Sequence, residues 1–166
     1  MGVLNRYLRL SLPIGGLLIA LLQRVSEAAV SVGDRCVGRI GRGLLVLVGV
    51  ERHDDRRSAA RLAERLLTYR VFLDDADRMN LSLVDVAGEL LLVPQFTLAA
   101  DTRKGTRAGF STAASPEVGR ELFGEFVRLC RERIPGTATG EFGAQMQVAL
   151  VNDGPVTFWL RVEPQA

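Results

Sequence analysis

The sequence predicts one α+β domain in which mostly antiparallel strands pack with two helices on one side of the sheets. Two apolar runs, 44–50 and 89–93, are typical of strands that are buried on both faces. Two other segments, 56–70 and a stretch that begins at Ser115-Pro116, have apolar residues at helical spacing. A chain of 166 residues is the length of one domain and can bury a core without disulfides.

The first residues are similar to a secretory signal peptide, because two arginines precede an apolar run and small residues follow it. Pro13 and Gly15-Gly16 interrupt that run, which is shorter than the roughly 20 apolar residues that cross a bilayer. We therefore expect residues 1–17 to be an extension, either disordered or an upstream mis-assigned start, and residues 18–166 to form the domain. The protein is then cytoplasmic without a membrane segment, and a mature N-terminus after Ala28 would contradict this.

The first half of the domain is expected to contain several strands and one helix. Gly33-Asp34 supplies the positive φ of a two-residue turn, which predicts a hairpin between 29–32 and 35–40. Asp54 or Asp55 is expected to cap the first helix. Further strands are expected at 18–25, 44–50 and 71–73, and the segment 81–86 is too short to assign.

The second half is organised around the strand that begins at Glu89. Pro94 removes a backbone donor, so strand pairing is expected to loosen there. Gln95-Phe96-Thr97 follow at this frayed end, and the basic loop 101–107 comes next. A rigid strand that opens into polar residues and cations is the arrangement we expect at a site for an anionic ligand.

The elements after the basic loop are marked by proline and glycine. Ser115 as cap and Pro116 as the first helical residue predict the start of the second helix, which Pro135-Gly136 ends. Strands are expected at 144–148 and 156–162. Gly154-Pro155 between them reads as a turn, and its peptide bond is of the kind that can be cis.

Composition and residue counts argue against several kinds of site. The net charge of +2 is mild, so nucleic-acid binding would need a local basic patch. Cys36 and Cys130 lie far apart without metal-ligand spacing, which favours free thiols in a reducing compartment. His53 is the only histidine, and Asp74–Asp77 lacks the glycine and the closing glutamate of a calcium loop. We expect no metal, no cofactor and no catalytic triad.

Two motifs resemble those of the D-aminoacyl-tRNA deacylases. That family carries Ser-Gln-Phe-Thr-Leu and Asn-x-Gly-Pro-Val-Thr, and this chain reads PQFTL at 94–98 and NDGPVT at 152–157. The similarity includes 20–27 and 142–146 and extends in register over roughly residues 18–160. Pro94 stands where the family usually has Ser, so a role for that hydroxyl does not carry over to this chain. Ala108 stands in a loop where Pro is common.

The resemblance implies a β/β/α layered, barrel-like domain that works as a homodimer with active sites at the subunit interface. It implies hydrolysis of the ester bond of D-aminoacyl-tRNA at the acceptor end, extending to glycine mischarged on non-cognate tRNA. For binding the substrate, it implies roles for Asn152, Gly154, Pro155, Phe142 and Met146.

No side chain is an obvious catalytic base, so main-chain groups remain. Backbone N–H groups at the end of a disrupted strand can donate to a developing oxyanion, and one such donor can be worth ~3 kcal/mol. The resemblance gives this role to the amides of Phe96 and Thr97, beside Gln95, with the ribose 2′-hydroxyl of the substrate helping to activate water. The Thr97 hydroxyl is the best side-chain candidate for a nucleophile or for orienting water.

Gly154-Pro155 is expected to sense the handedness of the substrate. A trans turn is the ordinary outcome, because only about 5–6% of X–Pro bonds in folded proteins are cis, but the resemblance favours cis. Both flanking carbonyls would then point the same way. They would form a wall, in the site of the partner subunit, that collides with an L side chain and leaves room for D residues or glycine.

Arg103, Lys104 and Arg107 are expected to contact phosphates of the tRNA acceptor end. Two other functions remain open. The first is a non-catalytic RNA-binding module for aminoacyl-tRNA ends, which a comparison of hydrolysis of D- and L-aminoacyl-tRNA would separate from the enzyme. The second is a thioesterase or peptidase that uses Cys36 or Thr97, and sensitivity to thiol reagents or to Thr97→Ala would indicate it.

Overall fold

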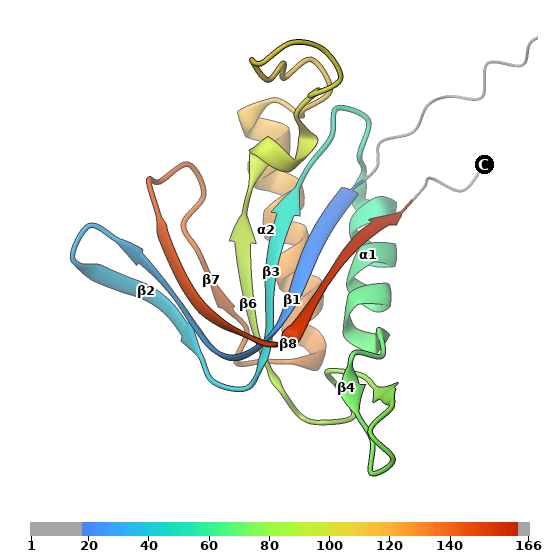
Figure 1. Cartoon of the computed structure of the whole chain (residues 1–166). Coiled ribbons are helices and arrows are strands. Elements are labelled where there is room, and N and C mark those ends of the chain that lie inside the picture. The colour runs from blue at the N-terminus through green and yellow to red at the C-terminus, as the bar shows by residue number, and fades with distance from the viewer. Residues whose placement is uncertain (1–17, 163–166) are drawn as a thin grey trace, which may run out of the picture.

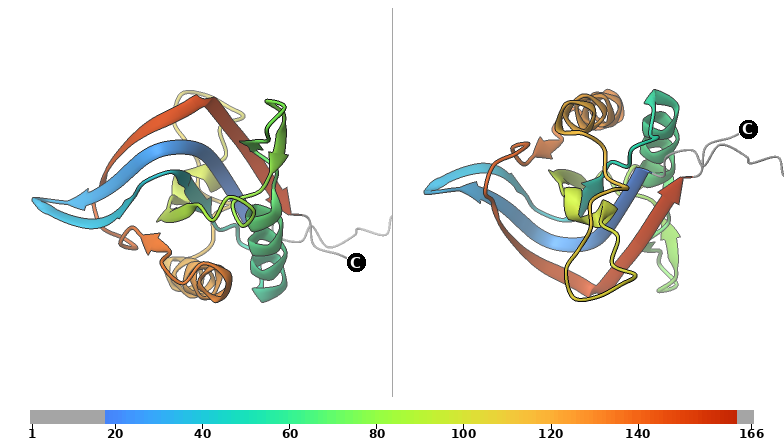
Figure 2. Two further views of the ribbon diagram at one scale, coloured as in Figure 1. Left: turned by 90° about the horizontal axis from the view of Figure 1, so that it is seen from below. Right: turned by 90° about the horizontal axis from the view of Figure 1, so that it is seen from above.

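The computed structural model describes residues 18–162, which form a curved six-stranded sheet with two helices on one side (Figures 1 and 2). The helices are α1 (Arg56–Thr68) and α2 (Pro116–Arg133), and a 3-10 turn, η1, spans Phe96–Ala99. The strands are β1 (Leu18–Val32), β2 (Arg35–Ile40), β3 (Gly43–Gly49), β4 (Phe72–Leu73), β5 (Met79–Leu81), β6 (Glu89–Pro94), β7 (Ala138–Thr139) and β8 (Gln147–Val162).

β1 is the central strand of the sheet, because it pairs antiparallel with β2 and β3 along one edge and with β8 along the other. Its expected pieces, 18–25 and 29–32, are one continuous strand. The same holds for 144–148 and 156–162, which lie in the long strand β8 or just before it. The turn expected at Gly154-Pro155 is therefore wrong: the pair lies in a bulge inside β8, since β8 resumes its pairing with β1 beyond it.

The sheet is mixed, because β6 runs parallel to both β3 and β7. The expectation of mostly antiparallel strands holds for the pairs of β1 and for the small β4–β5 sheet. The α+β class is confirmed, with the helices on one side (Figure 2). Residues 1–17 and 163–166 lie outside the described part of the chain, as does the expected N-terminal extension.

β3 and β6 are buried on both faces, as their apolar sequences predict. Alternate residues such as Leu44 and Leu90 pack in one cluster with the two helices, whereas Leu45 and Leu91 pack in a second cluster with residues of β2 and β1. A strand with apolar neighbours on both sides gains stability from every side chain, at roughly 25 cal/mol per Å² of apolar surface. These two strands therefore form a rigid base for the segments that follow their ends.

Capping residues determine where both helices begin. Asp55 accepts a hydrogen bond from the Ser58 amide (2.9 Å) and caps α1, and Ser115 caps α2 with Pro116 as its first residue. On α2, Val118 is 38% exposed, whereas Leu122, one turn further along, is buried. Between residues 18 and 162, neither helix is long and apolar enough to cross a membrane.

Asp54 is a buried carboxylate beside the start of α1. Its Oδ2 atom accepts a hydrogen bond from the Glu51 amide (2.7 Å), whereas its buried Oδ1 atom has no partner among the described residues. Burial raises the pKa of Asp54 to about 7, and the nearby Glu51 carboxylate also raises it. Because an unfolded chain releases this proton at a much lower pH, the contribution of Asp54 to stability falls as the pH rises from about 4 to 7.

Asp54→Asn should therefore stabilise the protein at high pH. The amide keeps the size of the side chain and removes the charge, so we expect Tm to rise by about 2–4 °C at pH 8, the shift that ~1 kcal/mol produces in a domain of this size. At pH 4 the gain should be absent. Thermal unfolding of both proteins at the two pH values measures the difference, and an equal shift at both values would contradict the assignment.

Candidate active site

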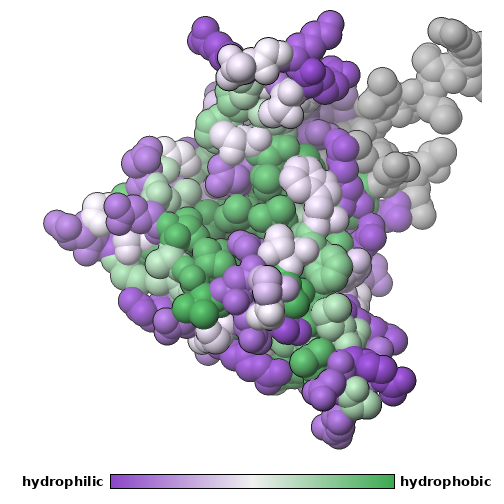
Figure 3. All heavy atoms as spheres, in the orientation of Figure 1, coloured by the Kyte–Doolittle hydropathy of each residue, from purple (hydrophilic) through white to green (hydrophobic). Residues whose placement is uncertain are grey.

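A pocket of about 660 Å³ lies beyond the ends of β3 and β6. The start of α2 and the segment 142–148 close its sides. Figure 3 shows apolar side chains gathered in the hollow over this part of the sheet. The pocket is lined by Val48, Val50, Val93, Pro94, Gln95, Phe96, Ala114, Ser115, Pro116, Gly119, Phe123, Phe142, Gly143, Ala144, Gln145, Met146 and Val148.

The segment after Pro94 is a 3-10 turn and not the frayed strand that the sequence predicts. β6 ends at Pro94, as expected, and the Gln95 amide then donates to the Val48 carbonyl (2.7 Å). Within the turn, the first bond runs from the Leu98 amide to the Gln95 carbonyl (3.3 Å). Because the first N–H groups of a helical turn have no partner inside it, the amides of Phe96 and Thr97 remain available as donors.

Two of the three predicted catalytic residues line the pocket, and the third does not. Gln95 and Phe96 line the pocket, whereas Thr97 is exposed and does not line it. The Gln95 side-chain amide donates to the Thr97 hydroxyl. A neutral amide that donates cannot take the hydroxyl proton, so this contact orients Thr97 without activating it as a nucleophile.

Neither cysteine lines the pocket. Cys36 is exposed on β2, and Cys130 is buried in α2, where burial raises the pKa of its thiol to about 12. A buried thiol with a raised pKa is unreactive at neutral pH. His53 is also outside the pocket lining. No group of three histidine, cysteine or acidic side chains between residues 18 and 162 is arranged to hold a metal ion.

Phe142 and Met146, the two residues expected to bind substrate, both line the pocket. The Arg120 guanidinium lies over the Phe142 ring, 4.9 Å from its centroid. The Met146 sulfur accepts a hydrogen bond from the Glu141 amide (3.3 Å). Pro94 also lines the pocket, so an apolar ring stands where the resembling family usually has a hydroxyl.

Hydrogen bonds among the other residues of its motif hold the Gly154-Pro155 bulge in place. Its peptide bond is cis. The Asn152 side chain accepts from the Val156 amide (2.9 Å) and donates to the Thr157 hydroxyl (3.0 Å). Asn152 thus positions the bulge, and Gly154 and Pro155 at its tip are exposed.

Arg24 of β1 is the site residue that the sequence analysis missed. It is only 7% exposed and donates from Nε to the Asp153 carbonyl (3.1 Å) and from Nη1 to the Val71 carbonyl (2.6 Å). Its Nε atom also lies 3.4 Å from the Asp153 carboxylate. The signal was that Arg24 continues the alternating positions of Leu18, Ala20 and Leu22, which are buried, because a buried charge needs partners.

The two motifs do not meet within one chain. The pocket is lined by residues up to Val148 and by none of 152–157. Figure 1 shows η1 beyond the upper end of β6, whereas β8 bends near the opposite end of the sheet. A single subunit therefore presents the pocket and the bulge as separate features.

The loop after η1 carries the predicted tRNA-binding cations. Paired bonds between the backbones of Asp101 and Gly109 (2.7 and 3.0 Å) close it. Arg103 donates to both oxygens of Asp101 (2.8 and 2.7 Å), which holds the pKa of Asp101 well below its usual range. Lys104 and Arg107 are exposed and form no ion pair in the described part of the chain.

Comparisons with known proteins settle the family. A sequence profile described as D-Tyr-tRNA(Tyr) deacylase matches residues 21–161. The chain belongs to this family. A D-aminoacyl-tRNA deacylase of Thioalkalivibrio sulfidiphilus is 64% identical over 148 residues, covering 89% of this chain and 99% of the relative.

Two solved structures are similar to this D-Tyr-tRNA(Tyr) deacylase family member. A c-Myc DNA unwinding element binding protein is 36% identical, with a TM-score of 0.82 over 89% of this chain and 99% of the other. A probable eukaryotic D-amino acid tRNA deacylase is 18% identical, with a TM-score of 0.80 over 88% of this chain and 100% of the other, and it shows the likeness of the fold.

Replacing Arg24 tests how the family's Gly-Pro bulge is held. Arg24→Met removes donors from two carbonyls, and a hydrogen bond to a charged group is worth roughly 1.5–3 kcal/mol. We expect a loss of about 3 kcal/mol in urea unfolding. Arg35→Met is the matched control, because Arg35 pairs with Glu141 on the surface and should cost less than about 1 kcal/mol. Similar losses in the two variants would rule out the anchoring role.

Proposed function

We propose that this chain hydrolyses the ester bond of D-aminoacyl-tRNA and rejects the L form. It acts as a homodimer in which each site combines the pocket of one subunit with Gly154-Pro155 of the other. The observation that carries the proposal is the turn after Pro94, because its first two amides, those of Phe96 and Thr97, have no partner within the turn, and Phe96 lines the pocket. The name of the relatives as D-aminoacyl-tRNA deacylases supports the same reaction.

The chemistry uses main-chain donors. Water adds to the ester carbonyl, and the negative charge that develops on the carbonyl oxygen is stabilised by the N–H groups of Phe96 and Thr97, each worth ~3 kcal/mol in such a site. The tetrahedral intermediate then expels the ribose oxygen, which takes a proton, and the free amino acid and the tRNA leave. The 2′-hydroxyl of the terminal ribose helps to activate the water. An aminoacyl ester is already labile, so this modest assistance suffices.

Handedness is sensed by backbone atoms at the tip of the bulge. Gly154 has a φ of +135°, where L side chains are rarely found, and a Cβ at this position would lie 2.7 Å from Cγ2 of Val156. The bulge is exposed and held by Asn152 and Arg24, so it can enter a second subunit without rearranging. A wall made of main chain excludes L side chains of any identity and admits glycine, which has none.

The acceptor end of the tRNA lies along the basic loop. Arg103, Lys104 and Arg107 contact its phosphates, and Lys104 and Arg107 contribute the larger share because Asp101 already pairs with Arg103. The alternative from the sequence, a non-catalytic RNA-binding module, is disfavoured by the deacylases that this chain resembles. The hydrolysis assay below tests the enzyme directly.

The decisive assay compares hydrolysis of D- and L-aminoacyl-tRNA charged with the same amino acid. We expect kcat/KM to favour the D form at least about 100-fold, which corresponds to ~2.7 kcal/mol of discrimination. Gly154→Val should abolish the activity, measured at a temperature well below the Tm of the variant, because Tm should itself fall where a Cβ at a φ of +135° lies 2.7 Å from Val156 Cγ2. Gly136→Val is the control, since a Cβ at Gly136 meets nothing within 4 Å. If the protein hydrolyses both forms equally well, or hydrolyses neither, the proposal is wrong.

Mixing two inactive variants tests whether the site is shared between subunits. Ala144→Trp fills the pocket, and Gly154→Val distorts the bulge. In a mixed dimer, one site joins the intact pocket of the second variant to the intact bulge of the first. Co-refolding the two should restore about a quarter of the wild-type activity if subunits pair at random. No recovery, with mixed dimers verified by mass spectrometry, would show that each subunit uses its own bulge.

A further inference from the structure

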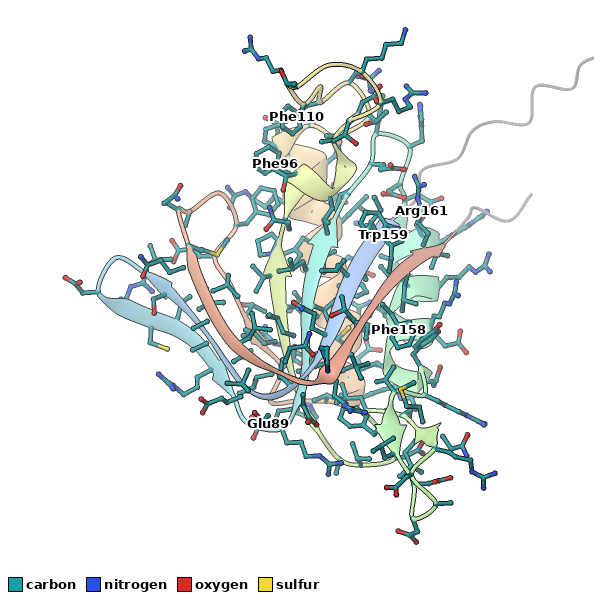
Figure 4. All side chains as sticks on the ribbon, in the orientation of Figure 1. Glu89, Phe96, Phe110, Phe158, Trp159 and Arg161 are labelled. Carbon is teal, nitrogen blue, oxygen red and sulfur yellow. The ribbon has the colours of Figure 1, made fainter. Side chains whose placement is uncertain are left out.

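We propose that Phe96 and Phe110 form a stacking platform for an unpaired base of the RNA acceptor end, next to the nucleotide that carries the ester. This rests on the proposed function and extends the site beyond the pocket. Phe110 was not singled out by the sequence, and it does not line the pocket. Figure 4 shows the two rings side by side below the basic loop.

The two rings are unusually open to solvent for phenylalanine. Phe96 is 63% exposed, the largest value among the big apolar side chains of residues 18–162, and Phe110 is 45% exposed. Their centroids are 5.2 Å apart and their planes are tilted by 41°. At this separation no base fits between them, so a base stacks on the outer face of the pair. Large exposed apolar groups of this kind indicate a binding surface.

The platform is held in place before any ligand binds. Phe96 is the first residue of η1, and Phe110 directly follows the backbone bonds between Asp101 and Gly109 that close the loop. The Phe110 carbonyl then accepts from the Ala113 amide (3.2 Å). Ordering of aromatic rings by such contacts lowers the entropy cost of binding.

The charges around the pair favour a nucleic acid over a protein partner. Lys104 and Arg107 project from the same loop and form no ion pair in residues 18–162. Protein interfaces are depleted of charge at their cores, whereas single-stranded RNA is bound by aromatic rings that stack bases and by cations that follow the backbone. Figure 4 shows nitrogen-tipped side chains on the loop beyond the two rings.

The position of Phe96 sets the order of contacts along the strand. Phe96 lines the pocket that takes the aminoacyl ester, and Phe110 lies beside it on the side of the basic loop (Figure 4). The terminal nucleotide is therefore nearest the pocket, the preceding base lies over the rings, and the phosphates before it reach Lys104 and Arg107. Stacking is sequence-tolerant, because every base has a flat face.

The test compares a full substrate with a truncated one. Phe110→Leu keeps an apolar residue but removes the ring. We expect it to lower kcat/KM for D-aminoacyl-tRNA about 10-fold, mainly through KM, within the range of one lost base stack. Hydrolysis of D-aminoacyl-adenosine, which lacks the preceding nucleotides, should be unchanged. Phe110→Trp should restore activity on the tRNA.

Salt dependence gives a separate readout for the loop. Lys104→Ala and Arg107→Ala should each reduce the slope of log K against log salt by about 0.7–0.9, and Phe110→Leu should leave the slope unchanged. Arg39→Ala, on the distant strand β2, is the control.

Several results would overturn the platform. These are equal losses on both substrates, no loss on tRNA, or a change of oligomeric state of Phe110→Leu by light scattering, which would make the pair a protein interface. Inactivity of the wild type on both substrates would instead refute the proposed function. Binding of an uncharged oligonucleotide ending in ACCA, measured by fluorescence anisotropy, then still tests the stacking: weaker binding by Phe110→Leu supports it, and equal binding refutes it.

Discussion

The pairing of the first described strand with the last sets the geometry on which the rest depends. β1 and β8 pair from Leu18 and Val162 at one end to Ser31 and Gln147 at the other. Between the partners of Gln23 and Val25, four residues of β8 face the single residue Arg24. The surplus chain cannot lie in the ladder, so it projects as a bulge whose two ends are fixed by strand on both sides. Gly154 and Pro155 are exposed for this reason.

The end of β6 produces the second feature in a comparable way. A strand buried on both faces cannot continue past Pro94 with normal pairing, and the chain tightens into η1. This one transition frees the amides of Phe96 and Thr97, puts Gln95 at the pocket and starts the path to the basic loop. Gln95 and Phe96 thus follow directly from β6, which pairs with the buried strand β3, and this limits their movement relative to the sheet.

Signals that act over a few residues predicted the structure well. Asp55 and Ser115 cap their helices, and Pro94 ends its strand, because these effects depend only on neighbouring backbone. Gly154-Pro155 was misjudged because a turn and a bulge carry the same local signal, and the distant strand β1 decides between them. The parallel pairing of β3 with β6 and the contacts of Arg24 and Phe110 likewise depend on partners far along the chain.

Pro94 stands where the family usually has serine, and this difference bears on which groups stabilise the transition state. If a hydroxyl at this position took part in catalysis, a member of the family without it would lose the reaction. In this chain the ring of Pro94 lines the pocket, while the donors that we propose for the ester are amides, which no substitution of a side chain removes. A main-chain mechanism tolerates the change and has a different requirement. The backbone atoms that contact the substrate must be fixed in position. At the Gly154-Pro155 bulge, the hydrogen bonds of the buried Arg24 to the carbonyls of Asp153 and Val71 meet that requirement.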